Sequence, residues 1–213
     1  MAFILPILNK LRLEVTFAIG EQLLPSLLLS FADNHPEYRL QSRMGYSRRI
    51  ETRLATGLSD LALIEKAPDH PDILVQKWFE DELILVCAPN HSLSSLSVIP
   101  IQELTRQKFV LRESQSSMRI ILDQKLQDAG ILKLPISLEV GSTDTIVEML
   151  SRGLHMSFLP KFAVKDALKN NLLRHINVDP LKIKVTLWIA RNRSSINNPV
   201  AEAFIQLLRN QSN

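Results

Sequence analysis

The sequence predicts an α/β fold made of two Rossmann-like lobes. Strand-like and helix-like periodicities alternate along the chain, and they do so twice in the same order. The strands are expected to start at residues 11 and 108, 38 and 136, and 60 and 154, which gives offsets of 97, 98 and 94 residues. Such near-constant offsets indicate two similar lobes, each with a parallel sheet covered by helices.

The first half of the chain has the order β-α-β-α-β. Apolar residues alternate with polar ones at its start, and Pro and Gly mark the helix ends. The expected elements are a strand at 11–19, a helix from Pro25 to His35-Pro36, a strand at 38–44, a helix capped by Ser47 and closed by Gly57, and a strand at 60–64.

The second half repeats this order, again with capping serines and glycines at the helix ends. Its expected elements are a strand at 108–111, a helix closed by Gly130, a strand at 136–140, a helix capped by Ser142 and ended by Gly153, and a strand at 154–159.

Two further strand-like segments, 82–88 and 183–190, are expected to cross between the lobes, and a last amphipathic helix starts at Pro199. We therefore assign residues 11–83 plus 194–213 to lobe I and 84–193 to lobe II. Residues 1–10 are read as a linker remnant or a tail.

Composition places the chain among ordinary globular proteins, with 46% apolar and 22% charged residues. No apolar run approaches the ~18 residues of a membrane span. The opening nine residues lack a basic region and a cleavage site, so we expect a cytoplasmic protein without membrane contact. The single cysteine, Cys87, excludes an internal disulfide and is expected to be a buried, inert thiol.

The net charge of +3 favours anionic partners but is too small for a nucleic-acid footprint. Basic residues gather in two places, which we interpret as solvated helix faces, with more weight for the lysines. These are Arg43, Arg48, Arg49 and Arg53, and then Lys161, Lys165 and Lys169. The dispersed histidines and the absence of nucleotide-binding or nucleophile motifs predict no metal, no cofactor and no enzyme.

Open α/β sheets bind ligands beyond the carboxyl ends of their strands, so two facing lobes would enclose a cleft. Its expected lining is mostly hydroxyl, amide and backbone N–H groups, with few titratable pairs, which suits binding better than catalysis. The lining comprises 16–22, 45–47, Glu65, 113–117, Ser142, Thr143 and 159–161.

Four segments carry a resemblance to the effector-binding domain of LysR-type transcriptional regulators. Residues 11–25 (LRLEVTFAIGEQLLP) resemble the family's S-x-T-I-G-x-x-L-L-P turn, and 54–65 (LATGLSDLALIE) its L-x-x-G-x-x-D-L-A-L segment. Residues 81–93 (DELILVCAPNHSL) are similar to D-E-L-V-L-V-x-P-x-x-H-P-L, and 112–119 (RESQSSMR) match R-E-x-G-S-G-T-R in part.

The resemblance implies a two-lobed fold of the type 2 periplasmic-binding-protein kind, with a small anionic effector in the interlobe cleft. It also implies a homodimer in which each lobe packs against the other lobe of its partner, or a tetramer of the full-length protein. DNA would be bound only through an amino-terminal winged helix-turn-helix. Since ten residues precede Leu11 here, we expect a regulatory domain without that DNA reader.

The expected ligand-binding residues follow from the cleft and the resemblance together. They are Thr16, Ala18, Gly20, Gly45, Tyr46, Ser47, Ser114, Gln115, Ser116, Ser117, Arg119, Ser142, Phe158 and Pro160. The sequence departs from the family pattern at Ala18, Tyr46, Gln115, Ser117 and Met118, which predicts a narrower and less polar cleft.

Several of these residues have a structural interpretation beside the functional one. Thr16 could bind an effector carboxylate or cap a turn, and one of Ser116 and Ser117 should cap a helix. Arg119 lies in a first helical turn, so it needs a partner, either the effector or an acid such as Glu113. Ser142 is expected to be a cap, and Glu65 a residue of the rim.

The leading hypothesis is thus the ligand-sensing domain of a bacterial LysR-type regulator, in which a metabolite modulates DNA binding by the full-length protein. A solute-binding protein for a small anion would share the fold. An enzyme such as a dehydratase would need an acid/base pair, and the expected lining offers only Glu21, Glu65 and Glu113.

Overall fold

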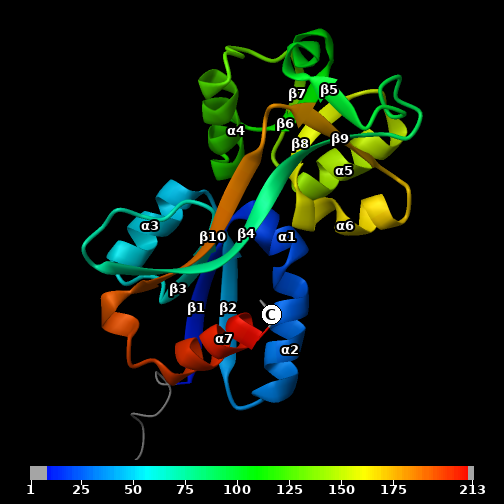
Figure 1. Ribbon diagram of the computed structural model, residues 1–213. Helices are drawn as coiled ribbons and strands as arrows, with labels where there is room; N and C mark the ends of the chain where they lie inside the picture. Colours follow the sequence, from blue (N-terminus) through cyan, green and yellow to red (C-terminus); the bar gives the residue numbers. More distant parts are fainter. Residues whose placement is uncertain (1–8, 211–213) are drawn as a thin grey trace, which may run out of the picture. The chain divides into compact units, whose positions relative to one another are not determined.

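A computed structural model describes residues 9–210, which form two compact units (Figure 1). Unit 1 contains the chain up to Glu80 and again from Thr186, and unit 2 is Asp81–Val185. The proposed linker remnant or tail at 1–10 lies outside the described residues except for Asn9 and Lys10.

The divisions between the units fall before the boundaries expected at 83/84 and 193/194. Each lies inside one long strand, β4 (Ile73–Cys87) or β10 (Ile183–Asn192). Because both strands run from one unit into the other without a break, strand periodicity does not mark the point of division.

Unit 1 is built on a parallel sheet. Strand β1 (Lys10–Val15) lies between β2 (Arg39–Met44) and β3 (Leu61–Ile64) and is parallel to both. Strand β10 adds to β3 in the antiparallel direction, and β4 follows β10.

Unit 2 repeats this topology. Strand β6 (Phe109–Arg112) lies between β7 (Ile136–Val140) and β8 (Met156–Pro160), parallel to both, and β4 adds to β8 in the antiparallel direction. Two short additions, β9 (Arg174–Asp179) and β5 (Val98–Pro100), extend from β4. The predicted duplication of an α/β order is therefore confirmed.

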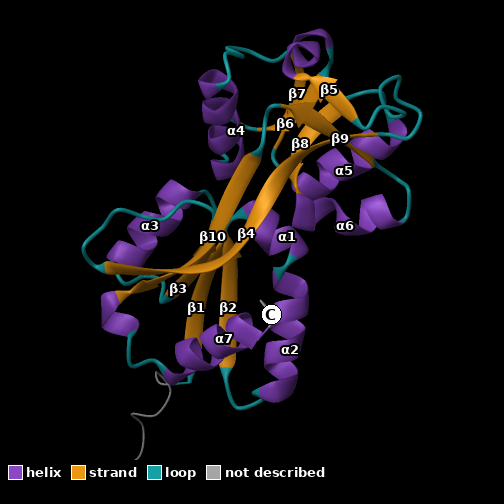
Figure 2. Ribbon diagram, viewed as in Figure 1, coloured by secondary structure: helices purple, strands orange, loops and turns teal. Residues whose placement is uncertain are grey.

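Helices cover both faces of the sheet in each unit (Figure 2). Unit 1 has α1 (Phe17–Gln22), α2 (Leu24–Asn34), α3 (Ser47–Ala55) and α7 (Pro199–Asn210). Unit 2 has α4 (Ser117–Asp128), α5 (Thr143–Arg152) and α6 (Lys161–Lys169). Short 3-10 turns lie at Ile101–Arg106 and Arg193–Ser195. None of the described helices is long and apolar enough to cross a bilayer.

The strand expected at 11–19 was wrong beyond Val15. The amide of Gly20 donates to the carbonyl of Thr16 at 2.8 Å, and residues from Phe17 onward are helical. Ala18, Ile19 and Gly20 are buried consecutively, which a strand with one solvated face would not allow. The apolar alternation at this point came from a helix packed tightly onto the sheet.

The core of unit 1 has two sides. Helices α2 and α7 meet on one side, where the rings of Phe31 and Phe204 pack edge to face at 5.3 Å. On the other side, Ile50 and Leu54 of α3 pack against Ala62 and Ile64 of β3. Each large side chain buried in this way contributes about 1.5–3 kcal/mol relative to exposure.

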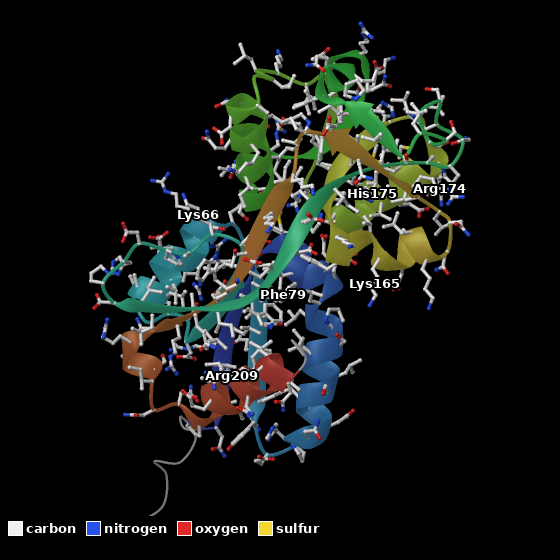
Figure 3. The ribbon with its side chains drawn as sticks, in the orientation of Figure 1. Lys66, Phe79, Lys165, Arg174, His175 and Arg209 are labelled. Atoms are coloured by element: carbon white, nitrogen blue, oxygen red, sulfur yellow. The ribbon has the colours of Figure 1, made fainter. Side chains whose placement is uncertain are left out.

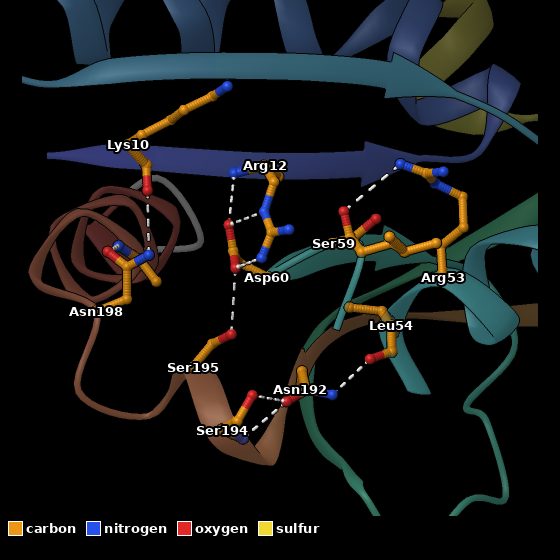
Figure 4. Close-up of polar contacts among 12 residues, drawn as sticks. Lys10, Arg12, Arg53, Leu54, Ser59, Asp60, Asn192, Ser194, Ser195 and Asn198 are labelled. Carbon is orange, nitrogen blue, oxygen red and sulfur yellow. Dashed lines mark hydrogen bonds and ion pairs between the residues drawn. The ribbon is translucent and has the colours of Figure 1, made fainter. Parts of the chain in front are cut away.

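A buried polar cluster ties the start of β1 to the start of β3 and to the 3-10 turn at Arg193–Ser195 (Figure 4). Both Nε and the backbone N–H of Arg12 donate to Asp60 Oδ2, at 3.0 and 2.8 Å, and Nη2 donates to Oδ1 at 2.6 Å. The Ser195 hydroxyl also donates to Oδ1, at 3.3 Å. Burial raises the pKa of Asp60, but the hydrogen bonds from Arg12 and Ser195 outweigh it and leave the pKa below its ordinary value.

A second buried acid, Glu14, lies on β1 two residues after Arg12. Glu14 Oε1 accepts hydrogen bonds from Arg53 Nε at 2.6 Å and from the Ser59 hydroxyl at 2.9 Å. Arg53 was interpreted as part of a solvated basic face, and this was wrong because its guanidinium reaches under α3 to neutralise Glu14. Arg43, Arg48 and Arg49 are exposed, as are Lys161, Lys165 and Lys169.

We predict that Asp60→Asn lowers the free energy of unfolding by about 2 kcal/mol at pH 7, because it weakens charged hydrogen bonds in a buried position. Because the pKa of Asp60 is lower in the folded state than in the unfolded state, its ionised form stabilises the fold at pH values above the unfolded-state pKa of about 3.9. This stabilisation is lost as the pH falls through the folded-state pKa. Urea unfolding at pH 7 and pH 3 should therefore show a smaller difference between wild type and variant at pH 3. An equal difference at both pH values would contradict this account.

Candidate functional site

The first set of candidate residues follows the three parallel strands of unit 1. Thr16 comes directly after β1, Gly45–Ser47 after β2, and Glu65 after β3. Because β1 is parallel to both of its neighbours, these segments lie at one edge of the sheet. The carboxyl edge of an open α/β sheet is where ligands bind in such folds.

Thr16 and Glu65 form a direct contact at this edge. Both are buried, with 4% of each exposed, and the Thr16 hydroxyl donates to Glu65 Oε1 at 2.7 Å. Thr16 holds the N-cap position of α1, yet its side chain makes no capping hydrogen bond. The interpretation of Thr16 as a side-chain cap was wrong, and so was that of Glu65 as a rim residue.

Gly20 and Ala18 lie in α1 and are buried. A Cβ atom on Gly20 would lie 2.5 Å from Met44 Sδ and 2.9 Å from Val15 Cγ2. The glycine thus allows α1 to approach β1 and β2 closely, and this close approach fixes the place of Thr16 at the start of the helix.

Tyr46 and Ser47 begin α3 after the end of β2. Tyr46, not Ser47, holds the N-cap position, so the predicted capping role of Ser47 was wrong. The Tyr46 ring packs against Phe17 at 5.2 Å. The Ser47 hydroxyl is buried and has no hydrogen-bond partner among the described residues.

The corresponding edge of unit 2 is organised by Arg112, the last residue of β6. Its guanidinium is buried and donates to both Glu113 oxygens at 3.0 and 3.2 Å, and to the Thr143 hydroxyl at 3.2 Å. These contacts join the loop after β6 to the start of α5. Sequence analysis did not identify this arginine as a site residue, although it opens the motif at 112–119.

The four residues after Glu113 form a turn into α4. The Ser116 amide donates to the Glu113 carbonyl at 2.9 Å, which places Ser114 and Gln115 on the surface and Ser116 and Ser117 inside. Ser116 is the N-cap residue, but its hydroxyl makes no capping bond. The expectation that Ser116 or Ser117 caps α4 was wrong for Ser116, and Ser117 is already the first residue of the helix.

Arg119 is almost fully buried and anchored within unit 2. Its Nε contacts both oxygens of Asp123 at 2.9 Å, and its Nη1 donates to Glu139 at 3.1 Å and to the Arg112 carbonyl at 2.9 Å. The expectation of an acidic partner is confirmed, but the acids are Asp123 and Glu139, because Glu113 pairs with Arg112. The structure therefore gives Arg119 acidic partners one helical turn away and on β7, an arrangement that offsets its unfavourable position near the helix start.

The remaining candidates of unit 2 have structural roles. Ser142 accepts a hydrogen bond from the Thr145 amide at 3.2 Å and caps α5, as predicted. Phe158 is buried and stacks on Phe109 at 6.2 Å, and Pro160 holds the N-cap position of α6.

Asp81 was not predicted as a site residue, yet it supplies the cap that Pro160 cannot. Its Oδ2 accepts a hydrogen bond from the Phe162 amide at 3.2 Å. Burial raises the pKa of Asp81, and hydrogen bonds from the first amides of α6 oppose this only in part.

Lys165 on the same helix is exposed, as are Arg174 and His175 on β9 (Figure 3).

One groove of the described surface begins at Arg119 and extends along unit 2. The groove between α4 and β7 has a volume of about 430 Å³ and is lined by Arg119, Leu126, Leu132 and Leu138 among others. Within residues 9–210, no group of three or more His, Cys, Asp or Glu side chains could hold a metal ion.

In both units, then, hydroxyl groups and helix N-termini gather at the carboxyl edge of a parallel sheet, and α1, α3 and α4 start without a side-chain cap. This arrangement is that of an open α/β fold, the class of protein in which ligands bind beyond the carboxyl ends of the strands. The model of the LysR substrate binding domain matches residues 8–213, so the chain belongs to this family.

Named relatives agree with the family assignment. The chain is 33% identical over 190 residues to a probable RuBisCO transcriptional regulator of Cyanidium caldarium, covering 87% of this chain and 60% of the relative. It is 26% identical over 200 residues to the HTH-type transcriptional activator CmpR of Synechocystis, covering 94% and 65%. The chain thus spans about three fifths of the length of these regulators.

Solved structures share the fold. The regulatory domain of Synechocystis CcmR, in complex with 2-PG, has a TM-score of 0.85 at 22% identity, covering 96% of this chain and 97% of that one. The effector binding domain of QuiR, in complex with shikimate, has a TM-score of 0.79 at 20% identity, covering 95% and 96%. The predicted family and fold class are confirmed.

The cysteine of β4 gives a prediction about reactivity. Cys87 is fully buried, and burial raises the pKa of its thiol to about 11. Because the thiolate is the reactive form, we expect no reaction of the native protein with a disulfide reagent at pH 8 and one equivalent after unfolding in guanidinium. Stoichiometric reaction of the native protein within minutes would contradict this, and Cys87→Ser provides the blank.

Proposed function

We propose that this chain is the ligand-sensing domain of a transcriptional regulator and binds a small anionic metabolite at the carboxyl edges of its strands. The observation that carries the proposal is the uncapped start of α4, where the buried Ser116 and Ser117 follow a loop pinned by Arg112. A helix N-terminus directs backbone N–H groups and a favourable potential toward an anion. The ligand residues predicted from the sequence at this loop, Ser114–Ser117, belong to this proposal.

Binding alone does not make a sensor. A metabolite regulates transcription only if it has different affinities for two conformations of the protein. DNA would be contacted by a helix-turn-helix part of the full-length regulator, and a cytoplasmic location belongs to this proposal. A solute-binding role would use the same fold, but the relatives that the chain matches are named as transcriptional regulators, which favours regulation without catalysis.

The proposal is tested by thermal unfolding with 2-PG, shikimate and a panel of small organic anions. At about one hundred times its dissociation constant, a ligand should raise the melting temperature by about 5–10 °C. Ser116→Ala should reduce the shift, whereas Ser92→Ala, at an exposed turn, should leave it unchanged. A panel without any shift, or equal shifts in both variants, would contradict the proposal.

We also infer that the chain associates with a second copy through the sheet edges formed by β2 and β7. Both are edge strands in their units, with unpaired backbone groups on one side. The β2 edge carries the exposed Arg39 and Arg43, and the β7 edge carries Glu139, which is half exposed and pairs with Arg119. A two-fold axis would bring the β2 edge of each copy onto the β7 edge of the other.

Exposed apolar side chains accompany both edges. Leu29 on α2 and Met44 on β2 are 69% and 51% exposed. Leu132, after α4, and Leu138, on β7, are 85% and 45% exposed.

We predict that Leu138→Asp shifts the mass measured by light scattering from dimer to monomer. Leu172→Asp, at an equally exposed leucine on the turn after α6, serves as the matched control and should leave the dimer intact. A wild-type monomer at all concentrations would overturn this inference.

A further inference from the structure

The hydrogen bond between Thr16 and Glu65 decides which ligand groups this edge of unit 1 can accept. A threonine hydroxyl has one proton to donate and lone pairs to accept with. Here the proton is directed to Glu65 Oε1 at 2.7 Å, so the hydroxyl has only its acceptor capacity left for a ligand. An effector carboxylate or phosphate oxygen, which can only accept, finds no donor in this side chain.

The surrounding structure holds this bond in place. The Thr16 amide donates to the Leu63 carbonyl at 3.2 Å, and its carbonyl accepts from the Gly20 amide at 2.8 Å. Val15 is in register with Leu63 on the neighbouring strand. The side chains of Thr16 and Glu65, which follow these strands, therefore lie close together. Lys66, the next residue, is exposed and extends away from the sheet (Figure 3).

Turning the Thr16 hydroxyl toward a ligand would leave a buried carboxylate oxygen with one hydrogen bond fewer. Loss of a hydrogen bond to a buried charged group carries a large desolvation penalty. Oε1 of Glu65 is itself an acceptor, so it offers no hydrogen bond to a second acceptor brought within reach of Thr16. Both effects act against an acceptor-only ligand and in favour of a donor.

We propose that Glu65 is a specificity-determining residue that makes the unit 1 edge select a hydrogen-bond donor, either a hydroxyl or an ammonium group. The inference rests on the proposed function and refines its ligand class to hydroxy acids or amino acids. The anionic group of such a ligand points away from Glu65, and its donor group points toward Thr16. The sequence suggested that Thr16 contacts a carboxylate of the effector, which is an acceptor, whereas the proposal here is that it contacts a donor group.

The test uses calorimetric titration of the whole chain with ligand pairs that differ by one donor group. Malate against succinate adds a hydroxyl, alanine against propionate adds an ammonium group, and the hits of the thermal panel are compared with their deoxy or deamino analogues. We expect the donor-bearing member to bind at least tenfold more tightly. Thr16→Val should abolish this preference and Thr16→Ser, which keeps the hydroxyl, should retain it.

Glu65→Gln provides the sharpest comparison, since it removes the charge and offers Thr16 an amide donor in exchange. The tenfold preference should fall to about onefold or reverse, while Glu37→Gln, an exposed carboxylate of the same unit, should not change it. Unchanged melting temperature and circular dichroism of the free variants show that they fold.

Three outcomes are distinguishable. A donor preference that depends on Glu65 supports the inference. Binding of acceptor-only ligands as tight as that of their donor-bearing partners, or a preference indifferent to Glu65→Gln, overturns it and leaves the proposed function standing. If no member of any pair and no compound of the panel binds, both the proposed function and this inference are overturned.

Discussion

Parallel pairing of three strands, repeated in each unit, is the constraint on which the rest of this structure depends. Parallel strands need crossover helices, and every crossover here starts at the carboxyl edge of the sheet. Side chains 49 residues apart, such as Thr16 and Glu65, are thereby brought within 2.7 Å. The hydroxyls of Thr16, Ser47 and Ser116 lie at these edges, although none of them caps the helix that starts there.

Buried charges in both units lock this geometry. In unit 1, Arg53 pairs with Glu14 and Arg12 pairs with Asp60. A shift of β1 by one residue would separate both pairs and leave buried charges without partners. Arg112 and Arg119 do the same in unit 2, where one pins the loop after β6 to α5 and the other joins α4 to β7. The loop with the proposed ligand groups is thus held by two arginines that are themselves held by acids.

The order of the elements could be read from the sequence because it depends on local periodicity. Apolar spacing and the residues typical of helix ends predict the three parallel strands of each unit, the helices after them and the Ser142 cap. The short helix α1 was missed because Phe17 and Ile19 continue the alternation of β1, and the division points were missed because β4 and β10 are continuous. Local patterns say little about where a strand passes from one unit to the next.

The candidate residues could be placed at strand ends from the sequence, but their hydrogen-bond partners could not be predicted. Spacing placed Thr16, Tyr46 and Ser47 at the ends of strands, and the structure brings them to one edge. Spacing could not show that Thr16 donates its proton to Glu65, that Arg119 pairs with Asp123 and Glu139, or that Arg53 pairs with Glu14. Each of these contacts depends on the folded arrangement of the side chains. Hydrogen-bond direction is a tertiary property and needs the folded structure.

Amide hydrogen exchange with and without a ligand from the thermal panel tests the central claim most directly. Occupation of the carboxyl edges should slow exchange at the starts of α1, α3 and α4, where the N-cap side chains make no capping hydrogen bond. Protection confined to the groove between α4 and β7, or absent from all three helix starts, would contradict the account.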